Sequence, residues 1–186
     1  MKIFGQYVRW LIIGVISTAL AAILFVFGIF YLGNYGDEIR YSKIRAAGIV
    51  SRNEESFETV RQFIGGLDYS AYDAGEYATY TAIWMPDVLP GSSEYEMDVY
   101  ADQTYEEQIS DPAVNTALDT LFRKAHIDRI IQTRNEQSRS VFFAFSATVG
   151  VVYSRSGDEP GDRVEDGTYT FRRIDEHWFY WTHHWD

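Results

Sequence analysis

The last ten residues, HWFYWTHHWD, bring together side chains that could bind metal ions or stack on ligands. They contain three of the four histidines and three of the five tryptophans of the 186-residue chain. In a β-strand at about 3.3 Å per residue, His177 and His183 would share a face but lie roughly 20 Å apart, too far for one ion. His183 and His184 would point to opposite faces. The pattern therefore favours a terminal strand whose aromatic rings cover a sheet. A metal site is the less favoured interpretation.

Aromatic side chains interleaved with acids form a second chemical feature, along residues 69–105. Tyrosine offers contact area at a small entropic cost, so this mixture is typical of a recognition surface. The simpler alternative is that these tyrosines lie at strand edges with their hydroxyl groups in water. The residues predicted to form a binding surface are Tyr77, Tyr80, Trp84, Tyr95, Tyr100, Trp178, Trp181 and His183.

Familiar catalytic signatures are absent from the sequence. The chain has no cysteine, which excludes cysteine hydrolases, iron–sulfur proteins and thiolate zinc sites. No GxSxG, HExxH, phosphate-loop or strand-linked GxGxxG motif occurs. The acidic loop at residues 156–167 lacks the spacing of an EF-hand. We therefore predict no catalytic residue, no cofactor and no metal ligand.

The charge of the chain limits its partners. The net charge of −11 has the wrong sign for a general nucleic-acid binder. Residues 53–122 hold 15 acidic residues and a single basic one, Arg61, whereas residues 123–139 hold five basic residues and two acidic ones. An acidic segment favours a basic protein partner and speeds its association at low salt.

One segment is long and apolar enough to be a membrane anchor. The 23 positions from Trp10 to Leu32 carry no charge. As a helix with a rise of about 1.5 Å per residue they would span ~34 Å, enough for a hydrocarbon core of ~30 Å. Aromatic residues flank both ends, as in an interfacial belt. The run exceeds the ~7–15 apolar residues of a signal peptide. We therefore predict an uncleaved signal anchor and disfavour a cleaved leader.

The flanking charges indicate an orientation for this anchor. The N-terminal tail carries only basic charge, at Lys2 and Arg9, whereas the other flank carries Arg40, Lys43 and Arg45 beside two acids. The numbers of basic residues on the two sides of the segment are nearly equal, so the positive-inside rule discriminates weakly. The purely basic tail favours an arrangement with the N-terminus inside. We expect a single-pass protein of the cell membrane with an extracytoplasmic C-terminal domain.

Small residues within the anchor offer a route to self-association. Gly14, Thr18 and Ala22 recur at four-residue spacing, an interval that lets two membrane helices approach closely. A homo-oligomer formed through this helix is one interpretation. The alternative is that small residues are simply scattered through an anchor.

Composition divides the chain into four parts. We predict a short tail at 1–9, the transmembrane signal-anchor helix at 10–32, a juxtamembrane linker or helix at 33–50, and a soluble α+β domain at 51–186. The last part has the size of one ordinary domain with its own core. No internal repeat is present.

Two helices are predicted in this domain. The first helix is predicted to begin near Ser51 or Asn53, since Ser51 and Glu54 match a capping box, and Gly65 and Gly66 end it. Asp111 caps the second, with Pro112 at its first position. The apolar stripe that would dock the second helix comprises Val114, Leu118, Leu121, Phe122 and Ala125.

Strand patterns fill most of the remainder. Alternating or β-branched runs predict strands at 75–85, 94–101, 127–133, 140–154, 168–174 and 177–185. The run at 140–154 is apolar on both faces, so we expect one central strand there, with Gly150 permitting a bulge. The sequence thus predicts an α+β fold, a curved antiparallel sheet packed against one or two helices.

These features favour a binding function over catalysis. We expect a membrane-anchored accessory module (a sensor, an inhibitor or an immunity-like protein) whose acidic domain binds a partner. The alternative is a membrane-tethered hydrolase that acts on envelope material through an Asp/Glu pair, assisted by His126 or His177. Carboxylates are too numerous in this sequence for their presence to identify such a pair.

Overall fold

The computed structural model describes residues 2–67, 80–84, 95–101, 103–133, 140–161 and 168–184. The chain forms two compact units, Met1–Arg40 and Tyr41–Asp186. Among the predicted features, Tyr77, the part of the 75–85 strand beyond 80–84 and the second half of the acidic loop lie outside the described residues.

The first unit is one continuous helix, α1 (Lys2–Arg40). Its described apolar side chains from Ile13 to Ile29 are exposed. Within it, the Thr18 hydroxyl donates a hydrogen bond to the Gly14 carbonyl at 2.9 Å. Among the described residues, no helix of the protein combines the length and the apolar character needed to cross a membrane.

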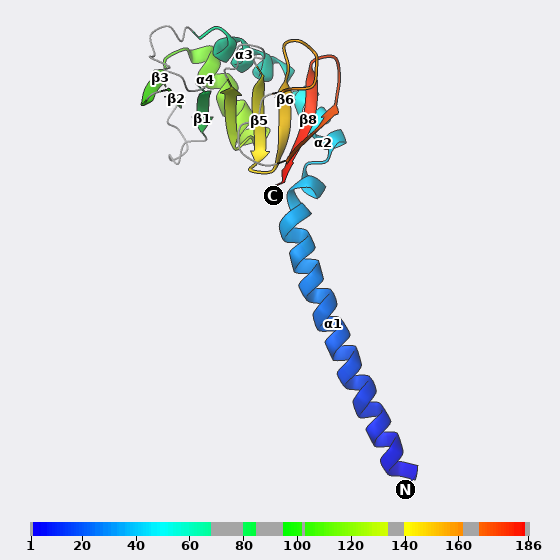
Figure 1. The fold of residues 1–186 in the computed structure, drawn as a ribbon. Helices are drawn as coiled ribbons and strands as arrows, with labels where there is room; N and C mark the ends of the chain where they lie inside the picture. Colours follow the sequence, from blue (N-terminus) through cyan, green and yellow to red (C-terminus); the bar gives the residue numbers. More distant parts are fainter. Residues whose placement is uncertain are drawn as a thin grey trace. The chain divides into compact units, whose positions relative to one another are not determined.

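The second unit is built on an eight-stranded antiparallel sheet with the order β3-β2-β1-β4-β5-β6-β8-β7 (Figure 1). An α+β architecture with an antiparallel sheet is therefore confirmed. The strands are β1 (Tyr80–Trp84), β2 (Tyr95–Tyr100), β3 (Thr104–Ile109), β4 (Arg129–Thr133), β5 (Val141–Ser146), β6 (Val149–Tyr153), β7 (Thr168–Arg173) and β8 (Trp178–His184).

Four helical segments accompany the sheet. They are α2 (Lys43–Arg52), α3 (Glu54–Gly65), α4 (Pro112–Asp119) and the π-helical turn η2 (Thr120–Lys124). The predicted cap of α4 is confirmed, because the Asp111 carboxylate accepts from the backbone N–H groups of Ala113 and Val114 at 2.8 and 3.4 Å. The predicted capping box is wrong: Ser51 lies inside α2, and Asn53 occupies the position before α3. A helix that ends at Arg52 leaves Ser51 unable to start another.

One face of the sheet packs against all four helical segments, and we call it the helix face. Its core includes Ala46 of α2, Phe57 of α3 and Leu118 of α4, each completely buried. The ring of Phe57 meets Phe143 of β5 edge-on at 4.8 Å. Every residue of the predicted stripe from Val114 to Ala125 is buried here, as expected. The apolar stripe therefore extends unbroken from α4 into η2.

The opposite face, which we call the second face, holds a separate apolar cluster contributed by strands alone. One cross-strand row of this face runs through every strand of the sheet. It reads Glu106, Asp98, Ala82, Ile131, Phe142, Val152, Phe179 and Arg173 from β3 to β7. The five central members are buried, whereas the row ends in acids at one edge and in an arginine at the other. The second face is therefore apolar in the middle and charged at its margins.

The predicted single strand at 140–154 is wrong, because the segment folds as a hairpin of β5 and β6 with a turn at Ala147 and Thr148. Both arms are central, so the apolar character of both faces was interpreted correctly. A register shift lies between Ala144 and Ser146. Directly opposite, a Cβ on Gly150 would lie 2.3 Å from the Phe143 carbonyl oxygen and 2.8 Å from Trp181 Nε1. Gly150 thus permits a close approach of neighbouring strands.

Strand β3 has no counterpart among the sequence-based expectations. It pairs with β2 through six residue pairs, from Tyr95 with Ile109 to Tyr100 with Thr104. Its sequence, TYEEQI, alternates but contains few apolar residues, and only Ile109 is buried. An edge strand that faces solvent needs little apolar surface, so its hydrophobic pattern is too weak to predict.

Candidate functional site

The strand register separates the eight residues predicted to form a binding surface. Tyr80, Trp84 and Tyr100 meet on the second face, on the adjacent strands β1 and β2. Trp181 and His183 also belong to that face but are buried. The remaining ones in the described chain, Tyr95 and Trp178, belong to the core of the helix face. The structure therefore brings together three of the predicted residues at an accessible position.

These three residues and three neighbouring carboxylates form what we call the aromatic–acidic patch: Tyr80, Trp84, Glu96, Asp98, Tyr100 and Glu106. The rings of Tyr80 and Tyr100 are stacked, with centroids 4.3 Å apart and planes inclined by 13°. Tyr80 is 38% and Trp84 is 40% exposed. Glu96 and Glu106 are exposed, and Asp98 is half-buried. The patch thus combines partly exposed rings with negative charge.

Hydrogen bonding fixes the centre of this patch. The Tyr100 hydroxyl donates to Asp98 Oδ2 at 3.1 Å. Burial raises the pKa of Tyr100, and the adjacent negative charge of Asp98 raises it further. Tyr100 therefore remains a neutral donor at physiological pH, and Asp98 retains further acceptor capacity for an incoming cation.

One cation of the chain itself, Arg129, already lies against a ring of this patch. The guanidinium carbon of Arg129, on β4, lies 5.6 Å from the centroid of the Trp84 ring. This distance is within the range of a cation–π interaction. The other exposed ring, Tyr80, lies at the end of β1 farther from Arg129.

Exposure singles out this patch within the second unit. Among the described residues from 41 onward, only three large apolar side chains are exposed, namely Ile44, Tyr80 and Trp84. Two of the three belong to the patch. Sequence reasoning identified its rings but did not single out its acids, because Glu106 lies on the unpredicted β3 and the acids of 53–122 are numerous. The cross-strand register is the signal that separates Glu96, Asp98 and Glu106 from the rest.

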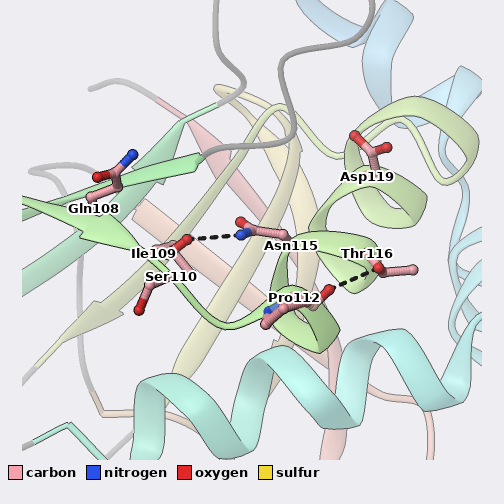
Figure 2. Close-up of a pocket in the computed structure, with 7 residues that line it drawn as sticks. All are labelled: Gln108, Ile109, Ser110, Pro112, Asn115, Thr116 and Asp119. Carbon is pink, nitrogen blue, oxygen red and sulfur yellow. Dashed lines mark hydrogen bonds between the residues drawn. The ribbon is translucent and has the colours of Figure 1, made fainter.

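A cavity of about 430 Å³ lies where β3 leads into α4 (Figure 2). Its polar groups mainly hold the two elements together. Asn115 Nδ2 donates to the Ile109 carbonyl at 2.8 Å, and the Thr116 hydroxyl donates to the Pro112 carbonyl at 2.8 Å. Asp119 accepts from the Tyr95 hydroxyl at 2.6 Å; burial chiefly, with this bond, raises the pKa of Tyr95 to about 12. These contacts indicate a structural junction.

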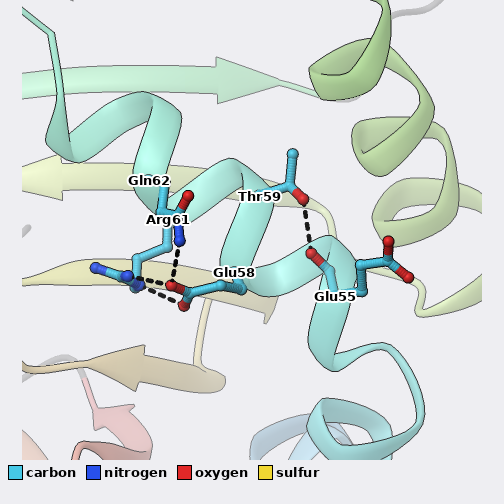
Figure 3. A network of polar contacts seen from close by, with 5 residues as sticks. All are labelled: Glu55, Glu58, Thr59, Arg61 and Gln62. Atoms are coloured by element: carbon cyan, nitrogen blue, oxygen red, sulfur yellow. Dashed lines mark hydrogen bonds and ion pairs between the residues drawn. The ribbon is translucent and has the colours of Figure 1, made fainter.

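A second hollow, of about 510 Å³, lies between α2, α3 and Trp178. Beside it, on the surface of α3, Glu58 accepts from Arg61 Nε at 2.7 Å, from Arg61 Nη2 and from Gln62 Nε2 at 2.7 Å (Figure 3). The hydrogen bonds from Arg61 lower the pKa of Glu58. The same guanidinium lies 4.5 Å from the centroid of Tyr153 on β6. This network ties α3 to the sheet.

The two cavities differ in the carboxylates that line them. The first cavity is lined by one carboxylate, that of Asp119, and the second by Glu54, Glu55 and Glu58, and neither is lined by a histidine. His177 stacks on Tyr153, and its Nδ1 lies 3.1 Å from the Ser154 carbonyl. In the part of the chain that the structure describes, no group of three or more potential ligands could hold a metal ion.

Comparison with known proteins adds no relative. The chain matches no protein-family model, and no curated protein and no solved structure is significantly similar to it.

Proposed function

We propose that this protein is a single-pass membrane protein whose α+β domain binds a basic protein partner through the aromatic–acidic patch. The observation that carries the proposal is the exposure of Tyr80 and Trp84 beside Asp98, on a sheet face whose other described large apolar side chains are buried or half-buried. Exposed aromatic residues surrounded by charge are typical of binding surfaces. The three carboxylates supply attraction for lysine and arginine.

The membrane anchor is supported by continuity and composition. Helix α1 includes the whole uncharged run from Trp10 to Leu32 without a break. A helix of 23 uncharged residues matches the thickness of a bilayer core. The described apolar side chains of α1 are exposed all round, a pattern that favours a lipid environment. Some side chains of the run lie outside the described residues. We propose that the C-terminal domain is extracytoplasmic.

The partner can be tested by site-specific photo-cross-linking of the full-length protein in its native membranes. A photoreactive amino acid at Tyr80 should give a covalent adduct with one basic protein. The same group at Ala113, an exposed position of α4, should not. The adduct from Tyr80 should weaken as salt is raised, because screening reduces the attraction between exposed charges.

Charge substitutions make this test specific to the patch. The triple variant Glu96→Gln, Asp98→Asn, Glu106→Gln should lose most of the adduct formed from Tyr80. A matched variant with Glu54→Gln, Glu55→Gln and Glu159→Gln removes as much charge from exposed positions elsewhere and should keep it. Equal adducts from Tyr80 and Ala113, or an adduct indifferent to the triple variant, would contradict the proposal.

A further inference from the structure

The third exposed apolar side chain of the second unit, Ile44, is unconnected with the aromatic–acidic patch. It lies in the first turn of α2 and is 85% exposed. Its helix is firmly packed, because Ala46 and Val50 are buried in the core. Just before the helix, the ring of Tyr41 stacks on Phe145 at 4.8 Å. The outward position of Ile44 is therefore built into the fold.

Basic residues surround this side chain. Lys43 and Arg45 flank Ile44 directly, and both are exposed. Residues 39–53 contain four basic residues and no acidic one, whereas residues 53–122 contain 15 acidic residues and one basic residue. In a chain of net charge −11, positive charge is thus concentrated around the exposed isoleucine. An apolar side chain between cations suits an anionic, partly apolar surface.

The covalent connection places such a surface within reach. Only ten residues separate Leu32, the end of the uncharged run, from Lys43. Eight of them are helical, at about 1.5 Å per residue, and two are not, at no more than about 3.6 Å per residue. The chain from Leu32 to the start of α2 can therefore span no more than about 23 Å. Headgroups of the bilayer that holds this run are accessible over that distance.

We propose that the first turn of α2 docks on anionic phospholipid headgroups. Ile44 inserts at the boundary between headgroups and acyl chains, and Lys43 and Arg45 contact lipid phosphates. This inference rests on the proposed membrane anchor and deepens it. Its consequence is that the domain is held against the bilayer by a second contact, in addition to the covalent tether.

Site-specific fluorescence of the full-length protein tests this contact. Because the chain has no cysteine, Ile44→Cys provides a unique site for an environment-sensitive fluorophore. The labelled protein is reconstituted into phosphatidylcholine nanodiscs with or without phosphatidylglycerol. In discs with phosphatidylglycerol, we expect a blue-shifted emission and quenching by spin-labelled lipid. The same label at Ala113→Cys should report water in both lipids.

Removal of the flanking charges supplies the second arm of the test. Lys43→Gln with Arg45→Gln should lower the ratio of docked to undocked protein by about 25-fold, since each basic residue near an anionic surface contributes about fivefold. Equal emission from position 44 in the two lipids, with the protein retained in the discs, would overturn the docking but leave the anchor intact. Failure of the protein to enter discs at all would overturn both.

Discussion

Register, more than residue type, decides what each aromatic residue of this protein does. Tyr95 and Tyr100 belong to the same strand, yet the first is core and the second is part of the patch. The alternation of apolar and acidic residues along β2 indicates this division from the sequence alone. The fate of Trp181 and His183 could not be predicted in the same way. Their burial depends on which strands flank β8, and the sequence of one strand does not indicate which strands pair with it.

Gly150 gives a prediction about close packing. Gly150→Ala should lower the free energy of unfolding by at least about 2 kcal/mol, because its Cβ would collide with the Phe143 carbonyl and the Trp181 indole. Chemical denaturation of the full chain in detergent, followed by tryptophan fluorescence, measures the change. Gly161→Ala is the control, since a Cβ there would meet no atom within 4 Å. Equal stabilities of the two variants would contradict the interpretation.

The ion pair of Glu58 and Arg61 gives a prediction about pH. A carboxylate whose pKa is lowered in the folded state stabilises the protein above its ordinary pKa, and this contribution is lost as the pH falls through the lowered value. Glu58→Gln should therefore lower the free energy of unfolding at pH 7 by no more than about 0.5 kcal/mol, because both side chains are partly exposed. The difference should begin to shrink as the pH falls to the ordinary glutamate pKa of about 4.3 and should disappear once the pH lies below the lowered pKa.

The variant Glu55→Gln is the control for the ion pair. This substitution removes the same charge from an exposed position of α3 and leaves the contact between Glu58 and Arg61 intact. A difference between wild type and Glu58→Gln that persists in acid would show that charge pairing is not its origin.

At the scale of elements, capping residues and glycines in the sequence correctly predicted where two helices begin or end. Asp111 and Pro112 start α4, and Gly65 and Gly66 end α3, as expected. The hairpin of β5 and β6 was missed because its turn, Ala147 and Thr148, contains none of the glycine, proline, asparagine or aspartate residues that mark most turns. Helix α2 was predicted only as a linker or helix within 33–50, because just two of its side chains, Ala46 and Val50, are buried.

The cap of α4 gives a prediction at this scale. Asp111→Ala should lower the free energy of unfolding by about 1 kcal/mol, since two backbone N–H groups lose their acceptor. Asp111→Asn should retain most of the stability, because its side-chain oxygen can accept the same bonds. Thermal unfolding monitored by circular dichroism distinguishes the three proteins. An equal loss in both variants would indicate that the charge, and not the cap, is responsible.

At the scale of the whole molecule, the two apolar faces of the sheet differ in what lies against them. The helices cover one, whereas the other has a buried centre, an aromatic and acidic margin at β1–β3 and Arg173 at β7. Fold class followed from the sequence, but this polarity did not, because it depends on the order of all eight strands. The separation of the exposed residues into two groups, the patch and the start of α2, supports a protein that contacts a partner and a membrane at different sites.

The anchor is the claim on which the other proposals depend, and alkaline carbonate extraction of membranes that carry the full chain tests it most directly. Intact-mass measurement of the extracted protein completes the experiment. We predict that the protein stays in the carbonate-resistant pellet and that its mass includes residues 10–32. Release into the supernatant, or a mass showing that the chain has lost those residues, would contradict the account.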